Sequence, residues 1–292
     1  MLIQRHADAV VVQAPAKVNL FLEVLAKRPD GYHEIATLMV AVDLYDTLEF
    51  KEERSAEIDI RCDNPELSTG PENLIYQAVA LLRRNHENLP GAAVMLKKRI
   101  PLAAGLAGGS SDAAATLAGL NVLWNLGLPQ EELARLGAEI GSDVPFFFGA
   151  SAAWCTGRGE QVTPTPLGAT LTFVLACPAA GLKTADVYRA CRMPAKPKTG
   201  EDIREAAAAG DVPAIGRSLW NRLQETAEAL QPAVATARKR LEDVGLPWTL
   251  MSGSGSAVFA LCRDQEEADR AIEKLDHGPE EGLSVFVVRS CT

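Results

Sequence analysis

The chain has 292 residues, of which 47% are hydrophobic and 23% charged, and its formal net charge is −9. This length fits two compact domains or one large one, and the composition argues against disorder over most of the chain. General nucleic-acid binders usually carry a basic balance, so the acidic charge argues against that class. We interpret the longest basic cluster, Lys97-Lys98-Arg99, as a solvated strand end; the alternative is a modest positive field near a phosphate site.

The first half of the chain predicts strands and helices in alternation. Apolar and polar residues alternate over 8–26, which indicates two strands, and Asp30-Gly31 marks a hairpin turn after them. The pattern over 35–50 predicts a strand with a bend at Asp43 and Asp46. Further strands are expected over 56–62, over 92–100 and from 151. Helices are expected over 73–86 and 130–140, and another helix is expected to follow a glycine-rich segment that ends at 112.

The second half begins after a predicted linker at 163–168, which contains two prolines and a glycine. The expected domains are therefore 1–167 and 168–292, in a mixed α+β fold. The segment 194–200 is polar and is expected to be mobile. Met251 to Leu261 is expected to form a second glycine loop running into a strand. Other strands are expected over 171–176 and 283–289, and helices over 201–209, 213–228, 232–244 and 265–276.

The cysteine spacing and the length of the apolar runs indicate the cellular compartment of the protein. None of the six cysteines belongs to a Cys-x-x-Cys pair, and no histidine stands at zinc spacing from them. A chain of this size does not need disulfides, so we expect reduced thiols and a cytoplasmic protein. The N-terminus has no signal pattern, and no apolar run approaches about 18 residues, so no membrane span is expected. The oligomeric state is left open.

The segment from Pro101 to Ser111, here called the glycine-rich loop, predicts a binding site for the phosphates of ATP. Its glycines leave backbone N–H groups uncovered, and the helix that follows adds unpaired N–H donors and the positive end of its dipole. The two serine hydroxyls could add donors or a magnesium ligand. The spacing is neither that of a Walker loop nor that of a dinucleotide-binding loop. The alternative is a tight strand-to-helix connection capped by Ser111 or Asp112. The loop consists of Pro101, Leu102, Ala103, Ala104, Gly105, Leu106, Ala107, Gly108, Gly109, Ser110 and Ser111.

Three segments form a set: Ala14–Leu22 (APAKVNLFL), the glycine-rich loop with Asp112, and Ser252–Ala257 (SGSGSA). Together they resemble the GHMP small-molecule kinases. Two more segments, RPDGYHE at 28–34 and GSDVPFF at 141–147, narrow the resemblance to the branch that phosphorylates 4-diphosphocytidyl-2-C-methyl-D-erythritol. The resemblance covers nearly the whole chain. It implies a two-domain GHMP kinase fold with the active site in the cleft between the domains.

The resemblance also implies roles for individual residues. ATP would phosphorylate the 2-hydroxyl of this substrate, with Asp143 as general base and Lys17 as its cationic partner. Tyr32 and His33 would hold the cytosine, and Tyr188 is the expected second stacking aromatic. Mg²⁺ is expected with ATP, but its ligands are not identified. The remaining substrate-binding candidates are Asn19 and Thr184.

Plainer interpretations stand beside these. Lys17 could be a solvated strand residue, Asp143 a cap, and Asn19 a brace for a turn or for the geometry of Lys17. The chain could be another kinase of the superfamily, acting on mevalonate, homoserine or a sugar. It could also be a nucleotide-binding protein without turnover. An aromatic next to a hydrogen-bonding ring at Tyr32-His33 favours a pyrimidine substrate, and the presence of both Lys17 and Asp143 argues for catalysis.

Overall fold

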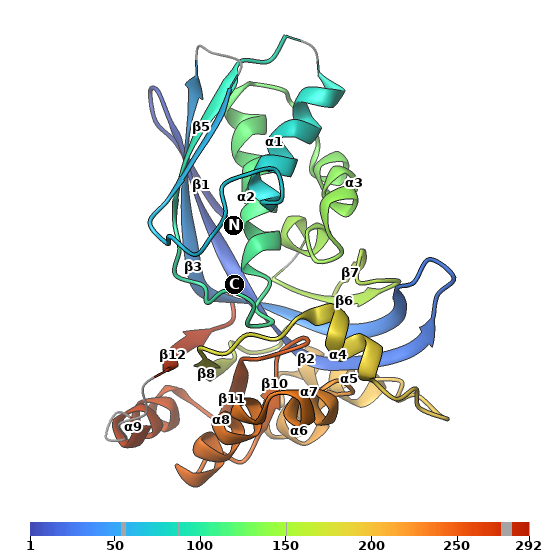
Figure 1. Ribbon diagram of the computed structural model, residues 1–292. Helices are drawn as coiled ribbons and strands as arrows, with labels where there is room; N and C mark the ends of the chain where they lie inside the picture. The colour runs from blue at the N-terminus through green and yellow to red at the C-terminus, as the bar shows by residue number, and fades with distance from the viewer. Residues whose placement is uncertain (54–56, 87, 150, 276–281, 292) are drawn as a thin grey trace. The chain divides into compact units, whose positions relative to one another are not determined.

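The computed structural model describes residues 1–53, 57–86, 88–149, 151–275 and 282–291 (Figure 1). The chain divides into two compact units that alternate along the sequence. The mixture of strands and helices confirms the predicted α+β class, and the boundary after residue 167 stays a prediction. Unit 1 comprises Met1–Ala16, Leu44–Ile100 and Ala107–Gly149, and unit 2 comprises Lys17–Asp43, Pro101–Leu106 and Ala150–Thr292.

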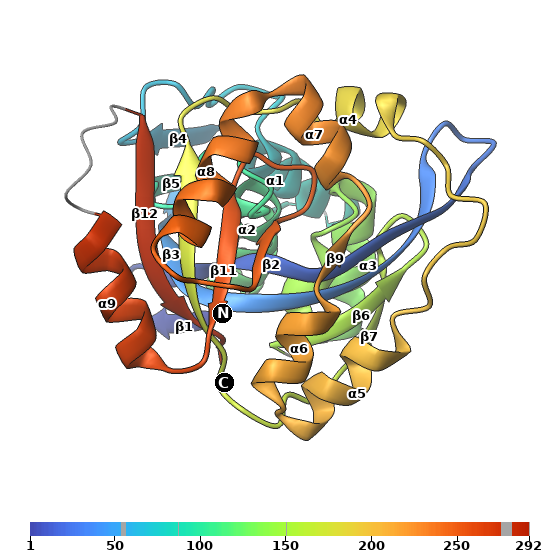
Figure 2. The same ribbon diagram turned by 90° about the horizontal axis from the view of Figure 1, so that it is seen from below.

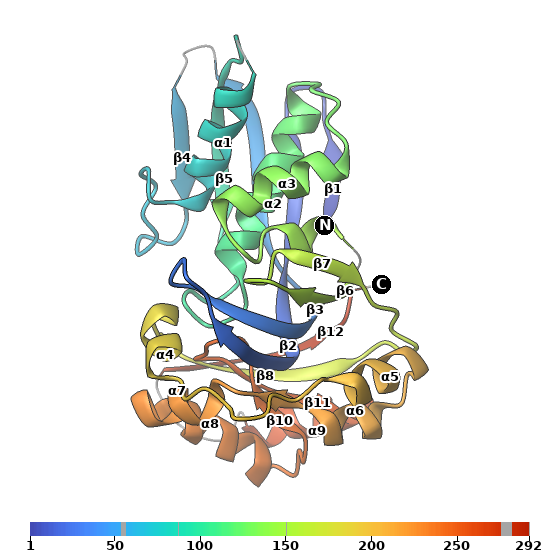
Figure 3. The same ribbon diagram turned by 90° about the vertical axis from the view of Figure 1, so that its right-hand side faces the viewer.

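Unit 1 is a sheet with helices on one face (Figures 1 and 3). β1 (Leu2–Arg5) pairs antiparallel with the start of β2 (Val10–Lys27). The end of β3 (His33–Glu53) pairs antiparallel with β5 (Gly91–Lys97), and β4 (Ile58–Cys62) pairs parallel with β5. The helices are α1 (Leu74–Asn85), α2 (Gly108–Leu123) and α3 (Gln130–Ile140), followed by the 3-10 helix η1 (Pro145–Phe148).

Helix α2 carries the second half of the glycine-rich loop into the core of unit 1. It is apolar on nearly all sides and buried along most of its length, which is typical of a central helix. A Cβ atom at Gly119 would lie 2.6 Å from the ring of Phe50 on β3, so only a glycine lets the helix approach the sheet this closely. The start of α2 is therefore fixed by packing further along the helix.

Unit 2 contains the remaining strands. The end of β2 and the start of β3 belong to it with β6 (Ala152–Thr156), β7 (Gln161–Pro164) and β9 (Trp220–Asn221). A second, antiparallel sheet has the order β10 (Thr249–Met251), β11 (Val258–Cys262), β8 (Thr172–Pro178), β12 (Leu283–Arg289). Helices α8 (Pro232–Asp243) and α9 (Gln265–Leu275) lie against one face of it (Figure 2). The helices of unit 2 are α4 (Thr184–Ala190), α5 (Glu201–Ala209), α6 (Val212–Ser218), α7 (Gln224–Leu230), α8 (Pro232–Asp243) and α9 (Gln265–Leu275).

Three predicted elements differ from the structure. Where two strands were expected over 8–26 there is one long strand, β2, which begins at Val10, and β3 is continuous through the bend expected at Asp43 and Asp46. The helix expected over 213–228 is interrupted, because Trp220 and Asn221 pair in parallel with Phe21 and Leu22 of β2. Residues 56 and 276, the predicted ends of a strand and a helix, lie outside the described residues. None of the described helices is long and apolar enough to cross a membrane.

Candidate active site

Lys17 lies on β2 and its side chain is inside the protein. Lys17 is 3% exposed, and its Nζ atom donates to Asn19 Oδ1 at 2.6 Å and to the carbonyl oxygen of Gly105 at 2.7 Å. Asn19 is itself oriented, because its Nδ2 donates to Thr37 Oγ1 at 2.8 Å, and that hydroxyl donates to the Phe21 carbonyl at 2.6 Å. The interpretation of Lys17 as a solvated strand residue is therefore wrong. The ammonium group is held in place beside the glycine-rich loop.

The second glycine loop supports the first half of the glycine-rich loop in unit 2. Gly105 has a φ of +75°, and a Cβ atom there would lie 2.2 Å from the carbonyl oxygen of Ser252. Ser252 Oγ donates to the Gly105 carbonyl at 3.0 Å, and the Ala257 amide donates to the Ala104 carbonyl at 3.0 Å. A Cβ atom at Gly253 would lie 3.1 Å from Lys17 Nζ. The glycine-rich loop, the second glycine loop and Lys17 thus contact one another at Gly105.

The second half of the glycine-rich loop forms the first turn of α2 in unit 1. The amide of Ser111 donates to the Ala107 carbonyl at 2.9 Å, and this is the first hydrogen bond within helix α2. The amides of Gly108, Gly109 and Ser110 precede it, in the turn where helix N–H groups have no partner within the helix. Gly109 is exposed, so this turn can accept an anion.

Two alanines of the glycine-rich loop adopt left-handed backbone angles. Ala103 has a φ of 51° and Ala107, the N-cap residue of α2, has a φ of 55°. An L-residue in this region costs roughly 1–2 kcal/mol, and a glycine there would not meet the same steric penalty. At these two positions the backbone of the loop therefore has the angles that glycine favours, although both residues are alanines.

Asp143 lies in a tight turn between α3 and η1 in unit 1. The amide of Val144 donates to the Gly141 carbonyl at 3.2 Å, and Val144, not Asp143, is the N-cap residue of η1. Asp143 is therefore not the N-cap residue of η1, and its role as general base stays a prediction. Lys17 belongs to unit 2, so its pairing with Asp143 stays a prediction.

The structure brings the ring of His33 next to that of Tyr188, from elements far apart in the sequence. His33 begins β3 and Tyr188 lies on α4, and the ring centroids are 5.2 Å apart at an interplanar angle of 32°. Burial lowers the pKa of His33, and the charge of Lys27 lowers it further. The imidazole is therefore neutral at pH 7 and offers one donor and one acceptor.

Tyr32 lies in the turn before β3 and is 53% exposed. Its amide donates to Asp30 Oδ1 at 3.0 Å, which fixes the turn, and the guanidinium carbon of Arg158 lies 4.9 Å from the centre of its ring. Thr184, the first residue of α4, is linked to the second glycine loop, since its Oγ1 lies 2.9 Å from Ser254 Oγ. Two aromatic side chains and a neutral histidine therefore belong to one unit, as a site for a flat base would require.

Comparisons with known proteins place this geometry in a family. The chain matches the models for the GHMP kinases N terminal domain over residues 73–150 and the GHMP kinases C terminal over residues 203–280. Two relatives are named 4-diphosphocytidyl-2-C-methyl-D-erythritol kinase. That from Geobacillus sp. (strain WCH70) is 44% identical over 91% of this chain and 92% of its own length, and that from Brevibacillus brevis is 42% identical over 96% of each. The chain belongs to the 4-diphosphocytidyl-2-C-methyl-D-erythritol kinase branch of the GHMP kinases.

Solved GHMP kinases have the same fold. A crystal structure of 4-(cytidine 5'-diphospho)-2C-methyl-D-erythritol kinase matches with a TM-score of 0.79 at 36% identity, covering 97% of this chain and all of that one. Homoserine kinase from Cytophaga hutchinsonii matches with a TM-score of 0.74 at 20% identity, covering 100% of this chain and 97% of that one, which is a likeness of fold alone. The predicted family and fold are confirmed.

Two groups of residues around the loops of this GHMP kinase were not anticipated from the sequence. Asn221 Nδ2 donates to the carbonyls of Met251 and Gly253 at 2.8 and 2.7 Å, and so fixes the second glycine loop. It lies in the stretch predicted as helix, where no signal pointed to it. Lys98 was interpreted as part of a solvated strand end, which is wrong, because its side chain is 3% exposed and lies between two aspartates.

Proposed function

We propose that this chain transfers the γ-phosphoryl group of ATP to the 2-hydroxyl of 4-diphosphocytidyl-2-C-methyl-D-erythritol. The observation that supports this most is the buried ammonium group of Lys17, hydrogen-bonded to the Gly105 carbonyl of the glycine-rich loop. A desolvated cation held by an anion-binding loop fits a reaction that depends on positioning and on neutralising phosphate charge. The substrate is proposed from the names of relatives that are 42–44% identical.

Asp143 is the proposed general base. A carboxylate next to the attacking hydroxyl can accept its proton, and an aspartate with an ordinary pKa of ~3.9 is ionised at pH 7. Lys17 is proposed to stabilise this charge and that of the transferring phosphoryl group.

The glycine-rich loop is proposed to bind ATP as its magnesium complex. Among the described residues, no group of three or more His, Cys, Asp or Glu side chains could hold a metal ion. This fits Mg²⁺, which usually takes one or two protein ligands and completes its shell with phosphates and water. Ser111 Oγ is a buried oxygen with no hydrogen-bond partner in the described structure, and we propose it as an oxygen donor to the bound complex. Mg²⁺ would neutralise phosphate charge there.

The cytidine end of the substrate is proposed to bind at Tyr32, His33 and Tyr188. Base stacking needs an aromatic face, which the exposed ring of Tyr32 offers, and the neutral imidazole of His33 can bond to the edge of a cytosine. Asn19 and Thr184 are proposed to contact the remaining polar groups of the substrate. No nucleic-acid partner is proposed.

A cytoplasmic location is also part of the proposal. Cys62, Cys177, Cys191 and Cys262 are free thiols, as in proteins of reducing compartments. Burial raises the pKa of the thiols of Cys177 and Cys262 to about 12, so neither is a reactive thiolate at pH 7. We further propose that the two domains divide after residue 167.

The function is tested by measuring ADP release with a panel of alcohols. The panel contains 4-diphosphocytidyl-2-C-methyl-D-erythritol, the same polyol phosphate without the cytidylyl group, mevalonate and homoserine. We expect turnover with the first compound, and values of kcat/KM for the others that are lower by orders of magnitude. Equal turnover with mevalonate or homoserine would contradict the proposed substrate. ATP binding without turnover on any alcohol would favour a non-catalytic nucleotide-binding protein.

A further inference from the structure

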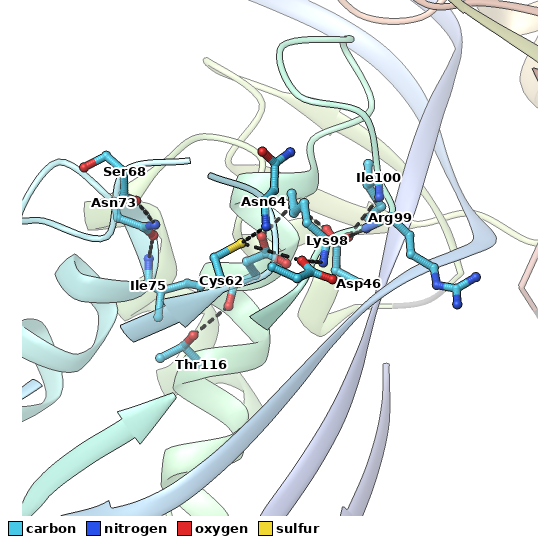
Figure 4. A network of polar contacts seen from close by, with 12 residues as sticks. Asp46, Cys62, Asn64, Ser68, Asn73, Ile75, Lys98, Arg99, Ile100 and Thr116 are labelled. Carbon is cyan, nitrogen blue, oxygen red and sulfur yellow. Dashed lines mark hydrogen bonds and ion pairs between the residues drawn. The ribbon is translucent and has the colours of Figure 1, made fainter. Parts of the chain in front are cut away.

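Three charged side chains from separate parts of unit 1 form a buried ion cluster, which consists of Asp46, Lys98 and Asp112. Figure 4 shows Asp46 and Lys98 of this cluster with the residues around them. Asp46 lies on β3, Lys98 directly follows β5, and Asp112 lies in α2. Lys98 Nζ bonds to Asp46 Oδ2 and, at 2.7 Å, to Asp112 Oδ2. The three side chains are only 3%, 0% and 3% exposed, in the order Lys98, Asp46, Asp112.

Asp46 holds the chain that leads into the glycine-rich loop. Its Oδ1 accepts from the amide of Arg99 at 2.6 Å and from that of Ile100 at 2.9 Å, while its Oδ2 accepts from the side chain of Lys98. The Lys98 amide is also fixed, since it donates to Asp63 Oδ1 at 2.8 Å. The three residues directly before Pro101 therefore all bond to carboxylates: the amides of Arg99 and Ile100 to the buried Asp46, and the amide of Lys98 to the exposed Asp63.

Lys98 also reaches the far end of the glycine-rich loop. Its ammonium group bonds to Asp112, the residue after Ser111. A Cβ atom at Gly108 would lie 3.0 Å from Lys98 Nζ and 3.0 Å from Ile100 Cγ2, so the first turn of α2 packs directly on the residues held by Asp46. The chain before the loop and the chain after it are thus tied together by one side chain.

An ion cluster is an unusual way to hold two elements together. Burying charges costs free energy, and apolar side chains of similar volume often give equal or greater stability. Charge-assisted hydrogen bonds, however, fix distance and direction more strictly than apolar contacts do. The first amides of α2 can bind phosphate well only if their position relative to the incoming strand is fixed within about 0.5 Å.

We propose that Asp46, Lys98 and Asp112 are positioning residues for nucleotide binding: they hold both ends of the glycine-rich loop in the geometry that ATP requires. This inference rests on the proposed function, because it assumes that the loop binds ATP. None of the three side chains needs to touch the nucleotide. Their removal should therefore weaken ATP binding without changing the binding of the phosphate acceptor.

The test compares two substitutions at Asp112 and two on β3. Asp112→Ala removes the acceptor for Lys98, whereas the amide oxygen of Asp112→Asn can still accept that bond. Asp46→Asn has one acceptor oxygen for three donors. Asp43→Asn is the matched control, since Asp43 lies on the same strand and its Oδ1 accepts from the amide of Arg289 instead, at 2.6 Å. Each variant is measured for Kd of ATP by calorimetry, for KM of both substrates, and for Tm.

We expect Asp112→Ala and Asp46→Asn to raise Kd and KM for ATP at least about tenfold, the scale of a lost charged hydrogen bond. KM for the acceptor should stay within about twofold of the wild-type value, a margin that corresponds to about 0.4 kcal/mol. Asp112→Asn should raise KM for ATP several-fold less than Asp112→Ala, and Asp43→Asn should leave it unchanged. If Asp46→Asn does not fold, the contrast at Asp112 decides.

Two results would overturn the proposal. One is a folded Asp112→Ala protein with wild-type affinity for ATP. The other is a rise in KM that is equal for ATP and for the acceptor and that grows as Tm falls, in every variant. The cluster would then stabilise the fold only. A wild-type protein that binds no ATP would contradict the proposed function itself. This result is separate from the other two, because it is measured on the wild type and they are measured on variants.

Discussion

Lys17 Nζ donates a hydrogen bond of 2.7 Å to the carbonyl oxygen of Gly105, so the proposed catalytic cation is bonded to the proposed ATP-binding loop. The same carbonyl accepts from Ser252 Oγ at 3.0 Å, and Gly105 has no room for a side chain against Ser252. The first half of the glycine-rich loop, the cation and the second glycine loop are therefore bonded to one another in unit 2. Substitutions in it should affect turnover more than folding when they remove charge, and folding more than turnover when they add volume.

Replacing the cation should reduce turnover. We expect Lys17→Met to lower kcat about 10²- to 10³-fold, the usual cost of removing one preorganised stabilising donor. The matched control is Lys51→Met, because the side chain of Lys51 is 50% exposed and pairs with Glu49. The measurement is steady-state ADP release with both substrates saturating. Equal kcat for the two variants would remove Lys17 from the chemistry.

Replacing the proposed base should act on kcat alone. We predict that Asp143→Asn lowers kcat by about two to four powers of ten while Kd for ATP hardly changes. Asp59→Asn, at an exposed position of β4, serves as the control. Calorimetry gives Kd and single-turnover kinetics give the chemical step. A folded Asp143→Asn enzyme with near-normal turnover would show that positioning alone drives the reaction.

Two glycines of the loop should respond in opposite ways. A Cβ atom at Gly109 would make only an ordinary contact of 3.7 Å with Leu74, so Gly109→Ala should fold normally but place a methyl group where phosphate binds. We expect ATP binding to weaken by about 1–3 kcal/mol, or about 5- to 150-fold. Gly105→Ala should instead lower Tm, since its Cβ would lie 2.2 Å from the Ser252 carbonyl. The reverse pattern in Kd and Tm would refute this assignment.

Removing one stacking ring should affect one substrate only. Because stacking of a base on an aromatic ring is worth ~1–3 kcal/mol, Tyr32→Ala should raise KM for the cytidylyl substrate roughly 10- to 100-fold and leave KM for ATP almost unchanged. Tyr188→Ala should behave in the same way, and Tyr32→Phe, which keeps the ring, should lose little. The readout is steady-state kinetics with each substrate varied in turn. An effect of Tyr32→Ala on ATP alone would place the ring on the nucleotide side.

The buried ion cluster predicts a dependence of stability on pH. The pKa of the Asp112 carboxyl is raised to about 7, chiefly because the group is buried and also because of the charge of Asp46, while Lys98 opposes the rise. In the unfolded chain an aspartate has a pKa of ~3.9, so the unfolded state loses this proton first as the pH rises. The contribution to the free energy of unfolding is therefore fully present below pH ~4 and is lost as the pH rises through about 7.

Comparison of wild type with Asp112→Asn isolates this contribution, because the amide does not titrate. Between pH 5 and pH 8 the Tm of the wild type should fall relative to that of the variant. Lys98, Asp46 and Cys62 are the titratable groups that interact with Asp112, and they are present in both proteins. Parallel Tm profiles over this range would mean that Asp112 does not titrate in the folded state as described.

Local patterns predicted most of the elements, and the reasons for the failures are physical. The glycine-rich loop, α2 and the final strand follow from glycine spacing and apolar periodicity, which are local properties. The helix predicted over 213–228 failed because Trp220 and Asn221 pair with β2, a tertiary contact about 200 residues away in sequence. Lys98 was misread for the same reason, since the carboxylates that bury it come from β3 and α2.

In the candidate site, too, residues in local motifs were predicted and residues that act through tertiary contacts were not. Lys17, Asn19 and the two glycine loops were predicted from their motifs, and the structure brings them together at Gly105. Asn221 could not have been found, because its role is to bond two carbonyls of a loop that begins 30 residues later. The roles of Asp143, Tyr32, His33 and Tyr188 remain predictions for the experiments above.

The central claim is that this chain phosphorylates the 2-hydroxyl of 4-diphosphocytidyl-2-C-methyl-D-erythritol. The most direct test incubates the purified chain with that compound, ATP and Mg²⁺ and follows the phosphorus resonances by NMR. The account predicts one new phosphomonoester signal on the C2 oxygen for each ADP formed, with the diphosphate bridge of the substrate intact. ADP formed without a new phosphomonoester, or a phosphoryl group on a different hydroxyl, would contradict it.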